Sequence, residues 1–129
     1  MDRSIVILAK LDEIPRVSIA IEEAMRACAF PEEAILDLQL AVEEALANTI
    51  LHGYRDTSGE VSIAIQATQE AVQVRIEDHA PPFDPLSLLE PERGSDLARR
   101  RIGGLGVYLM RQVVDEVRYQ YIEGKNVLT

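Results

Sequence analysis

Two short segments in the middle of the chain alternate between large apolar residues and small or polar ones. The apolar positions are Val61, Ile63 and Ile65 in the first segment and Val72, Val74 and Ile76 in the second. A period of two puts all the apolar side chains of a strand on one face. Because only a short turn around residues 68–70 separates the segments, we predict an antiparallel hairpin with one face that must be covered.

Two helices upstream are predicted to supply that cover. The first begins at Asp12, an expected N-cap, and ends near Phe30. The second opens at Pro31 and runs to about His52, with Gly53 as its expected C-terminal stop. Apolar residues recur every three or four positions in both, as on the buried face of an amphipathic helix.

The rest of the chain completes a small α/β domain. Strands are expected at residues 4–11, 117–122 and 127–129, and a third helix at residues 107–114. Residues 80–102 form a long polar, proline-bearing stretch with several arginines, which is typical of a lid or binding loop. We predict that residues 1–129 form a single domain, a two-layer α/β sandwich with helices on one face of a mixed, mostly antiparallel sheet.

Charge and composition exclude several classes of partner. The formal net charge is −9, so the surface repels nucleic acid and is not attracted to an anionic membrane. The same field suits a partner with a basic patch, and the alternative is that the charge only keeps the protein in solution. There is one cysteine, Cys28, no apolar run long enough to span a bilayer and no signal-peptide pattern at the start. These features predict a cytoplasmic protein.

Three stretches carry residues suited to chemistry. Glu44 and Asn48 are four apart on the second predicted helix and share a face. An amide oxygen is a hard ligand suited to Mg²⁺, and a carboxylate can accept the proton of an attacking hydroxyl. The alternative for this pair is a solvated polar stripe.

The other two stretches lie at the end of a strand and at the start of a helix. Asp78 ends the second hairpin strand, where it can accept a hydrogen bond from an exocyclic amine or simply cap a turn. The run Gly103-Gly104-Leu105-Gly106 precedes a helix, where backbone amides can bind phosphate, although such glycines also form hinges.

The order of these motifs resembles the GHKL ATPase superfamily, and within it the anti-sigma factor serine/threonine kinases. The resemblance covers nearly the whole chain and implies the Bergerat, histidine-kinase-like ATPase fold. It is carried by the helix motif Leu40–Asn48, the stretch Pro81–Pro85, the glycines Gly103–Gly106 and the segment Asp115–Tyr119.

The resemblance also implies cofactors and roles. With ATP and Mg²⁺ bound, Glu44 would be the general base, Asn48 would hold the metal and Asp78 would read the adenine amine. Arg101 would meet the γ-phosphate, and Asn126 would lie near adenine. The nucleotide-binding residues implied are Asn48, Asp78, Ala80, Phe83, Arg101, Gly103, Gly104, Leu105, Gly106, Val107 and Asn126.

The chain departs from the family pattern at Ala80, where a glycine is usual. A methyl group there could crowd the base, unless the backbone keeps a negative φ. From the resemblance, the leading hypothesis is an ATP-dependent serine/threonine kinase that phosphorylates a STAS-type anti-anti-sigma partner. The resemblance also implies a homodimer, with a sigma factor as a possible second partner.

Two alternatives remain open at this stage. The chain could be a module that sequesters a sigma factor or another regulator with weak or no nucleotide binding. It could also be the catalytic domain of a histidine kinase, but the phospho-accepting histidine and the helix pair that carries it are not expected, because only His52 and His79 are present and both fall inside the ATPase core.

Overall fold

The protein is described by a computed structural model that covers residues 1–54, 59–82, 84 and 110–129. The regular elements are β1 (Asp2–Leu8), α1 (Ile14–Ala27), α2 (Glu32–Asn48), β2 (Glu60–Ala67), β3 (Val72–Asp78), β4 (Tyr119–Ile122) and β5 (Lys125–Leu128). A 3-10 turn, Leu11–Glu13, leads into α1, and a π-helical segment, Thr49–Tyr54, continues α2. Residues 110–113 are also helical.

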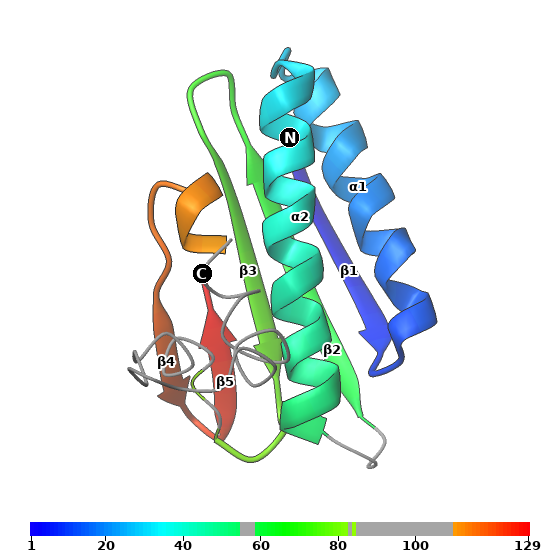
Figure 1. Ribbon diagram of the computed structural model, residues 1–129, viewed down its shortest axis with the longest axis vertical. Helices are drawn as coiled ribbons and strands as arrows, with labels where there is room; N and C mark the ends of the chain where they lie inside the picture. The colour runs from blue at the N-terminus through cyan, green and yellow to red at the C-terminus, as the bar shows by residue number, and fades with distance from the viewer. Residues whose placement is uncertain (55–58, 83, 85–109) are drawn as a thin grey trace, which may run out of the picture.

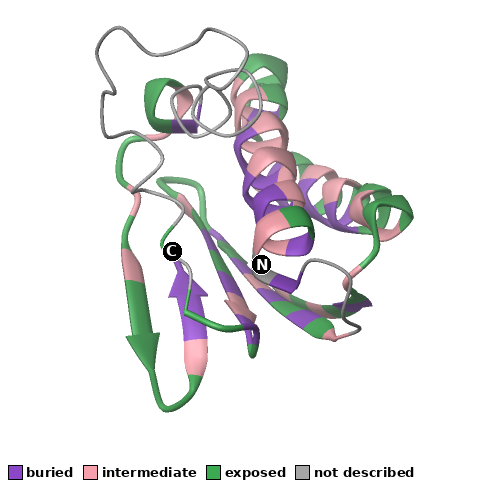
Figure 2. Ribbon diagram, turned by 60° about the horizontal axis from the view of Figure 1, so that its bottom comes forward, coloured by how far each residue is buried: buried purple, intermediate pink, exposed green. Residues whose placement is uncertain are grey.

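The strands form one twisted sheet that the helices cover on a single face (Figure 1). The strand order is β1-β2-β3-β5-β4, and each of the four strand pairs within the described residues is antiparallel. α1 and α2 lie side by side across β1, β2 and β3 (Figures 1 and 2). The predicted α/β sandwich, with its mostly antiparallel sheet, is confirmed.

The hydrophobic core fills the space between the helices and the sheet. The alternating residues of β2 and β3 point into it: Val61, Ile63 and Ile65 are at most 1% exposed, and Val74 and Ile76 are buried too. The buried and exposed residues therefore alternate along these strands, as Figure 2 shows. Burial of this apolar face, which stabilises by about 25 cal/mol per Å², ties the sheet to the helices.

The two helices differ in detail from the sequence prediction. Asp12 falls in the 3-10 turn, and α1 begins only at Ile14, with Glu13 as N-cap and no side-chain capping bond. The carboxylate of Glu13 instead accepts a hydrogen bond from Arg16, 3.2 Å away. Gly53 does not stop the second helix, because the chain continues as π-helix through Tyr54.

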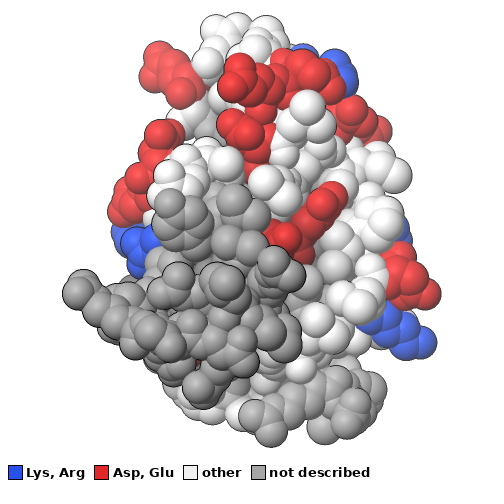
Figure 3. Space-filling model, viewed as in Figure 1, with Lys and Arg blue, Asp and Glu red and all other residues white. Residues whose placement is uncertain are grey.

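On the described surface that Figure 3 displays, Asp and Glu side chains cover more area than Lys and Arg, in line with the net charge of −9. Within the residues that the structure describes, no helix has the length and apolar character needed to cross a bilayer.

Candidate functional site

A buried polar cluster lies where β3 ends and β5 begins. Asp78 and Asn126 face each other in the register of these two strands, and each is 5% exposed. Oδ1 of Asp78 accepts two hydrogen bonds, from the Ala80 backbone N–H and from Nδ2 of Asn126, both at 2.9 Å. The donors that the described residues give this carboxylate thus converge on one oxygen, which leaves Oδ2 for a ligand.

The Asn126 amide is itself surrounded by partners. Nδ2 also donates to the carbonyl oxygens of Ala80 and Pro81, at 3.0 and 3.2 Å. The Tyr119 hydroxyl donates to Oδ1 on the other side of the amide. Both the nitrogen and the oxygen of this side chain therefore form hydrogen bonds within the protein, and the nitrogen holds Oδ1 of Asp78 in place.

Burial changes the ionisation of the Asp78 carboxyl. Removal from water raises its pKa, while the hydrogen bonds from Asn126 and Ala80 and the nearby His79 act in the opposite direction. The net shift is upward, because the loss of hydration outweighs the two bonds. Such a carboxylate is a strong acceptor for any N–H that reaches it.

The C-terminal part of α2 carries the two other predicted residues. Glu44 is half-buried, and Asn48, one turn on, is 6% exposed. The neighbouring Glu43 is already engaged, since it accepts a 2.7 Å hydrogen bond from the Ser18 hydroxyl of α1. Glu43 is thus turned toward α1, whereas Glu44 shares a helix face with Asn48.

In the part of the chain that the structure describes, the side-chain amide of Asn48 is incompletely partnered. Its Nδ2 is buried and has no hydrogen-bond partner among the described residues. An orphaned buried donor costs about 1–3 kcal/mol and calls for a missing partner. A phosphate oxygen could accept from it, or a rotation of the amide would present Oδ1, a hard oxygen ligand, to Mg²⁺.

Tyr54 connects the end of the helix to the end of β3. Its hydroxyl donates to the Glu60 carbonyl, 2.7 Å away, and accepts a hydrogen bond from the backbone N–H of His79 at 3.0 Å. The ring packs so closely on Gly59 that a Cβ there would lie 2.2 Å from the Cε1 atom of Tyr54. This anchor explains why the chain passes Gly53 in a π-helix, a form often found at functional sites.

Sequence reasoning missed both tyrosines of this region. The dipeptide Gly53-Tyr54 gave no sign that the ring would reach the next strand, and Tyr119 looked like any aromatic residue of a strand. The signal that could have found Tyr119 is its register: it pairs with Leu128, two residues from Asn126, which puts both on one face of the sheet.

The remaining predicted site residues lie outside the described residues: Phe83, Arg101, Gly103, Gly104, Leu105, Gly106 and Val107. Ala80 is described. It is 2% exposed, and it is not one of the residues with a positive φ, which among the described non-glycine residues are Ala29 and Glu123. The backbone at position 80 therefore accepts an alanine without strain.

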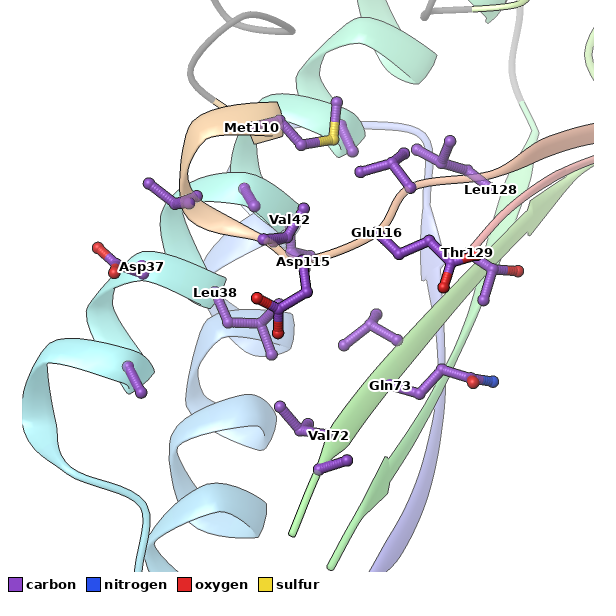
Figure 4. Close-up of a pocket in the computed structure, with 18 of the residues that line it drawn as sticks. Asp37, Leu38, Val42, Val72, Gln73, Met110, Asp115, Glu116, Leu128 and Thr129 are labelled. Atoms are coloured by element: carbon purple, nitrogen blue, oxygen red, sulfur yellow. The ribbon is translucent and has the colours of Figure 1, made fainter.

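A separate cavity of about 420 Å³ lies between α2, β3 and residues 110–118 (Figure 4). Its walls include Leu38 and Val42, and Asp115 and Glu116 stand beside it. Glu44, Asn48, Asp78 and Asn126 do not line it. The cavity is thus distinct from the polar cluster at the end of β3.

Comparison with known proteins agrees with the fold. Residues 7–129 match the family described as Histidine kinase-like ATPase domain. The chain is 34% identical over 104 residues to the Serine-protein kinase RsbW of Listeria innocua, covering 77% of this chain and 66% of that protein. It is 36% identical over 102 residues to the Serine-protein kinase RsbW of Bacillus subtilis, with 74% and 62% covered.

The chain therefore spans slightly less than two thirds of the length of these relatives. The family match covers nearly all of this chain, because it leaves out only the first six residues. This chain belongs to the histidine kinase-like ATPase family.

Proposed function

We propose that this chain binds ATP and transfers its γ-phosphoryl group to a serine or threonine of a STAS-type anti-anti-sigma partner. The observation that carries the proposal is the buried Asp78, whose Oδ1 holds two protein donors and whose Oδ2 receives none from the described residues. Membership of an ATPase family and similarity to proteins named as serine-protein kinases support it.

In this proposal the ends of the nucleotide meet different elements. Asp78 accepts a hydrogen bond from the adenine amine, and the glycines Gly103–Gly106 and Arg101 contact the phosphates. Asn48 would offer its amide oxygen to Mg²⁺, and its Nδ2, unpartnered among the described residues, would donate to a phosphate oxygen. The metal, when bound, neutralises charge on the triphosphate.

Glu44 acts as the general base in this scheme. It accepts the proton of the partner's hydroxyl as that oxygen approaches the phosphorus, so its work is positioning and proton transfer. Glu43 accepts a 2.7 Å hydrogen bond from the Ser18 hydroxyl through one carboxylate oxygen, which turns its side chain toward α1.

The decisive experiment compares glutamine variants of two neighbouring glutamates. Glu44→Gln and the matched control Glu43→Gln are assayed for transfer of labelled phosphate from Mg-ATP to a purified STAS-domain protein. Glu44→Gln should lower transfer by roughly 100-fold or more while ATP still binds, and Glu43→Gln should keep it. Wild-type transfer by Glu44→Gln would remove Glu44 from the mechanism.

Calorimetry with Mg-ATP tests the nucleotide itself. Absence of binding at millimolar ATP would contradict the kinase hypothesis and support the alternative, a module that sequesters its partner without turnover.

A sigma factor as second partner and a homodimer belong to the same proposal. Val6 and Leu8 are 51% and 49% exposed on β1, an edge strand, on the face that the helices leave open. Sedimentation of the wild type and of Val6→Lys measures whether this surface joins two copies, and an unchanged dimer in the variant would exclude it.

A further inference from the structure

We propose that Tyr119 is a positioning residue for adenine recognition, because its hydroxyl orients the Asn126 amide and that amide fixes the Asp78 carboxylate. The proposal rests on the proposed function, since it takes Asp78 as the residue that meets the base. It assigns a role to a strand residue that lies on the far side of Asn126 from Asp78.

The first step concerns the orientation of the amide. Three acceptors surround Nδ2 of Asn126: Oδ1 of Asp78 and the carbonyl oxygens of Ala80 and Pro81, at 2.9, 3.0 and 3.2 Å. If the amide were turned over, its oxygen would face three other oxygens. The nitrogen must therefore lie on this side, and the oxygen must point away from Asp78.

The second step concerns what meets that oxygen. The Tyr119 hydroxyl donates to it. Tyr119 pairs with Leu128 across β4 and β5, so that it reaches Asn126 diagonally on the same face of the sheet. Diagonal neighbours have Cβ atoms about 7–8 Å apart or somewhat less, a gap that a long side chain can bridge. Without the hydroxyl, the buried amide oxygen loses this bond, and the amide is held less firmly in the orientation that its Nδ2 contacts favour.

The third step leads from the amide to the ligand. With Asn126 and the Ala80 N–H both on Oδ1, the Asp78 carboxylate is held in one rotation. Its Oδ2 then faces the ligand as an acceptor only, which favours a 6-amino purine over one without that donor. If Asn126 moves, one of the two bonds that fix the carboxylate is lost.

The ionisation of Asp78 gives an independent readout. The hydrogen bond from Asn126 lowers the pKa of this carboxyl, against the larger effect of burial. Weakening that bond should raise the pKa of Asp78 further. The acid limb of ATP binding should then move to higher pH, which a purely structural role of the Tyr119 ring would not cause.

The experiment uses a pair of conservative variants in the same strand. Tyr119→Phe removes the hydroxyl that contacts Asn126 and keeps the ring, and Tyr121→Phe removes the hydroxyl of a residue that is 48% exposed. Calorimetry measures the affinity of each for Mg-ATP and for the triphosphate of purine riboside, which lacks the 6-amine. Tyr119→Phe should bind ATP roughly three- to tenfold more weakly.

The amine-free nucleotide separates the outcomes. Its affinity should stay at the wild-type value in Tyr119→Phe, and Tyr121→Phe should leave both nucleotides unchanged. The proposal is overturned if Tyr119→Phe weakens the binding of both nucleotides equally, or if it does not weaken the binding of ATP. In an Asn126→Ala background, Tyr119→Phe should have no further effect, and an undiminished effect there would also overturn it.

Failure of the ATP-binding step of the proposed function gives a different result. In that case the wild type itself fails to bind ATP, whereas failure of the Tyr119 proposal alone leaves a wild type that binds ATP and prefers it to the amine-free nucleotide.

Discussion

Replacement of Asp78 by asparagine should invert the preference of the site between 6-amino and 6-oxo purines. The reason lies in the two N–H donors, from Ala80 and Asn126, that converge on Oδ1 at 2.9 Å. In the variant, the amide oxygen must take the place of Oδ1, because an NH₂ group there would face both donors. The new NH₂ group then takes the place of Oδ2 and points toward the ligand.

The size of the change follows from the same geometry. ATP loses a hydrogen bond to a charged acceptor, worth about 1.5–3 kcal/mol, and its amine now faces a donor, which costs about 1–3 kcal/mol more. The sum, about 2.5–6 kcal/mol, corresponds to a weakening of roughly 10²- to 10⁴-fold. Inosine triphosphate presents an oxygen instead of the amine and should bind the variant better than it binds the wild type.

Calorimetry with ATP and inosine triphosphate, on the wild type and on Asp78→Asn, measures this inversion. Thermal melts in the absence of nucleotide serve as the control for folding. The variant should be at least as stable as the wild type at pH 7, because burial raises the pKa of Asp78 and its charge is costly in the folded state. If a folded Asp78→Asn variant loses affinity for ATP and for inosine triphosphate alike, the reasoning is refuted.

Three further predictions concern the same end of the sheet. ATP affinity should fall on acidification at a pH above the usual range of an aspartate, since the raised pKa of Asp78 brings protonation, and loss of the acceptor, to higher pH. Tyr54→Phe should lower the free energy of unfolding by about 1–3 kcal/mol, because it removes the hydroxyl between the Glu60 carbonyl and the His79 N–H. Ala80→Gly should lower it by about 1–2 kcal/mol, through the loss of a buried methyl group and the gain of chain freedom when unfolded.

Each of these has its own measurement and its own contrary result. ATP affinity is measured as a function of pH. If it falls in acid in the same way for Asp78→Asn as for the wild type, another group is responsible for the fall. Denaturant unfolding of Tyr54→Phe at wild-type stability would mean that water replaces the hydroxyl. Denaturant unfolding of Ala80→Gly at wild-type stability would contradict the third prediction, and tighter ATP binding by this variant in calorimetry would show that the methyl group crowds the base.

The linkage of stability to pH has a definite sign for Asp78. Because folding raises the pKa of this group, the folded state retains its proton over a range where the unfolded state has lost it. The contribution of Asp78 to stability therefore falls as the pH rises through that range. The stability advantage of Asp78→Asn over the wild type should grow over the same range and shrink again in acid.

Local sequence patterns predicted the parts of the fold that depend on burial. Alternation in the hairpin and helical spacing before it placed β2, β3, α1 and α2, because each pattern reflects one face turned to a common core. The prediction that Gly53 stops the second helix was wrong, because here a local signal conflicts with tertiary contacts. Gly53 is a local stop signal, but the contacts of Tyr54 with Glu60 and His79, which are distant in sequence or on another element, override it.

The candidate site was predictable to a similar degree. Asp78 could be identified as a strand-end acceptor, and Glu44 and Asn48 as neighbours on one helix face, from spacing alone. What spacing could not show is which donors occupy Asp78, or that Glu43 and not Glu44 is engaged with α1. The bonds from Asn126 to Asp78 and from Ser18 to Glu43 join residues far apart in the chain, whereas the bond from the Ala80 N–H is local.

Stability alone does not account for the way the end of β3 is built. Burial opposes ionisation of Asp78, so an apolar residue there would often stabilise a domain as well or better. The protein instead holds the carboxylate through Ala80 and Asn126, and ties the next N–H, that of His79, to Tyr54. These bonds fix the direction of one side chain and the path of the backbone beside it.

An arrangement of this kind has value when the orientation of the carboxylate matters. A group held by a second layer of hydrogen bonds keeps its free oxygen in one place, and this preorganisation is what selective recognition of a ligand requires. Tyr119 extends the layer by one residue to β4. It follows that substitutions at Tyr119 and Asn126 should alter which nucleotide is chosen more than they alter whether the domain folds.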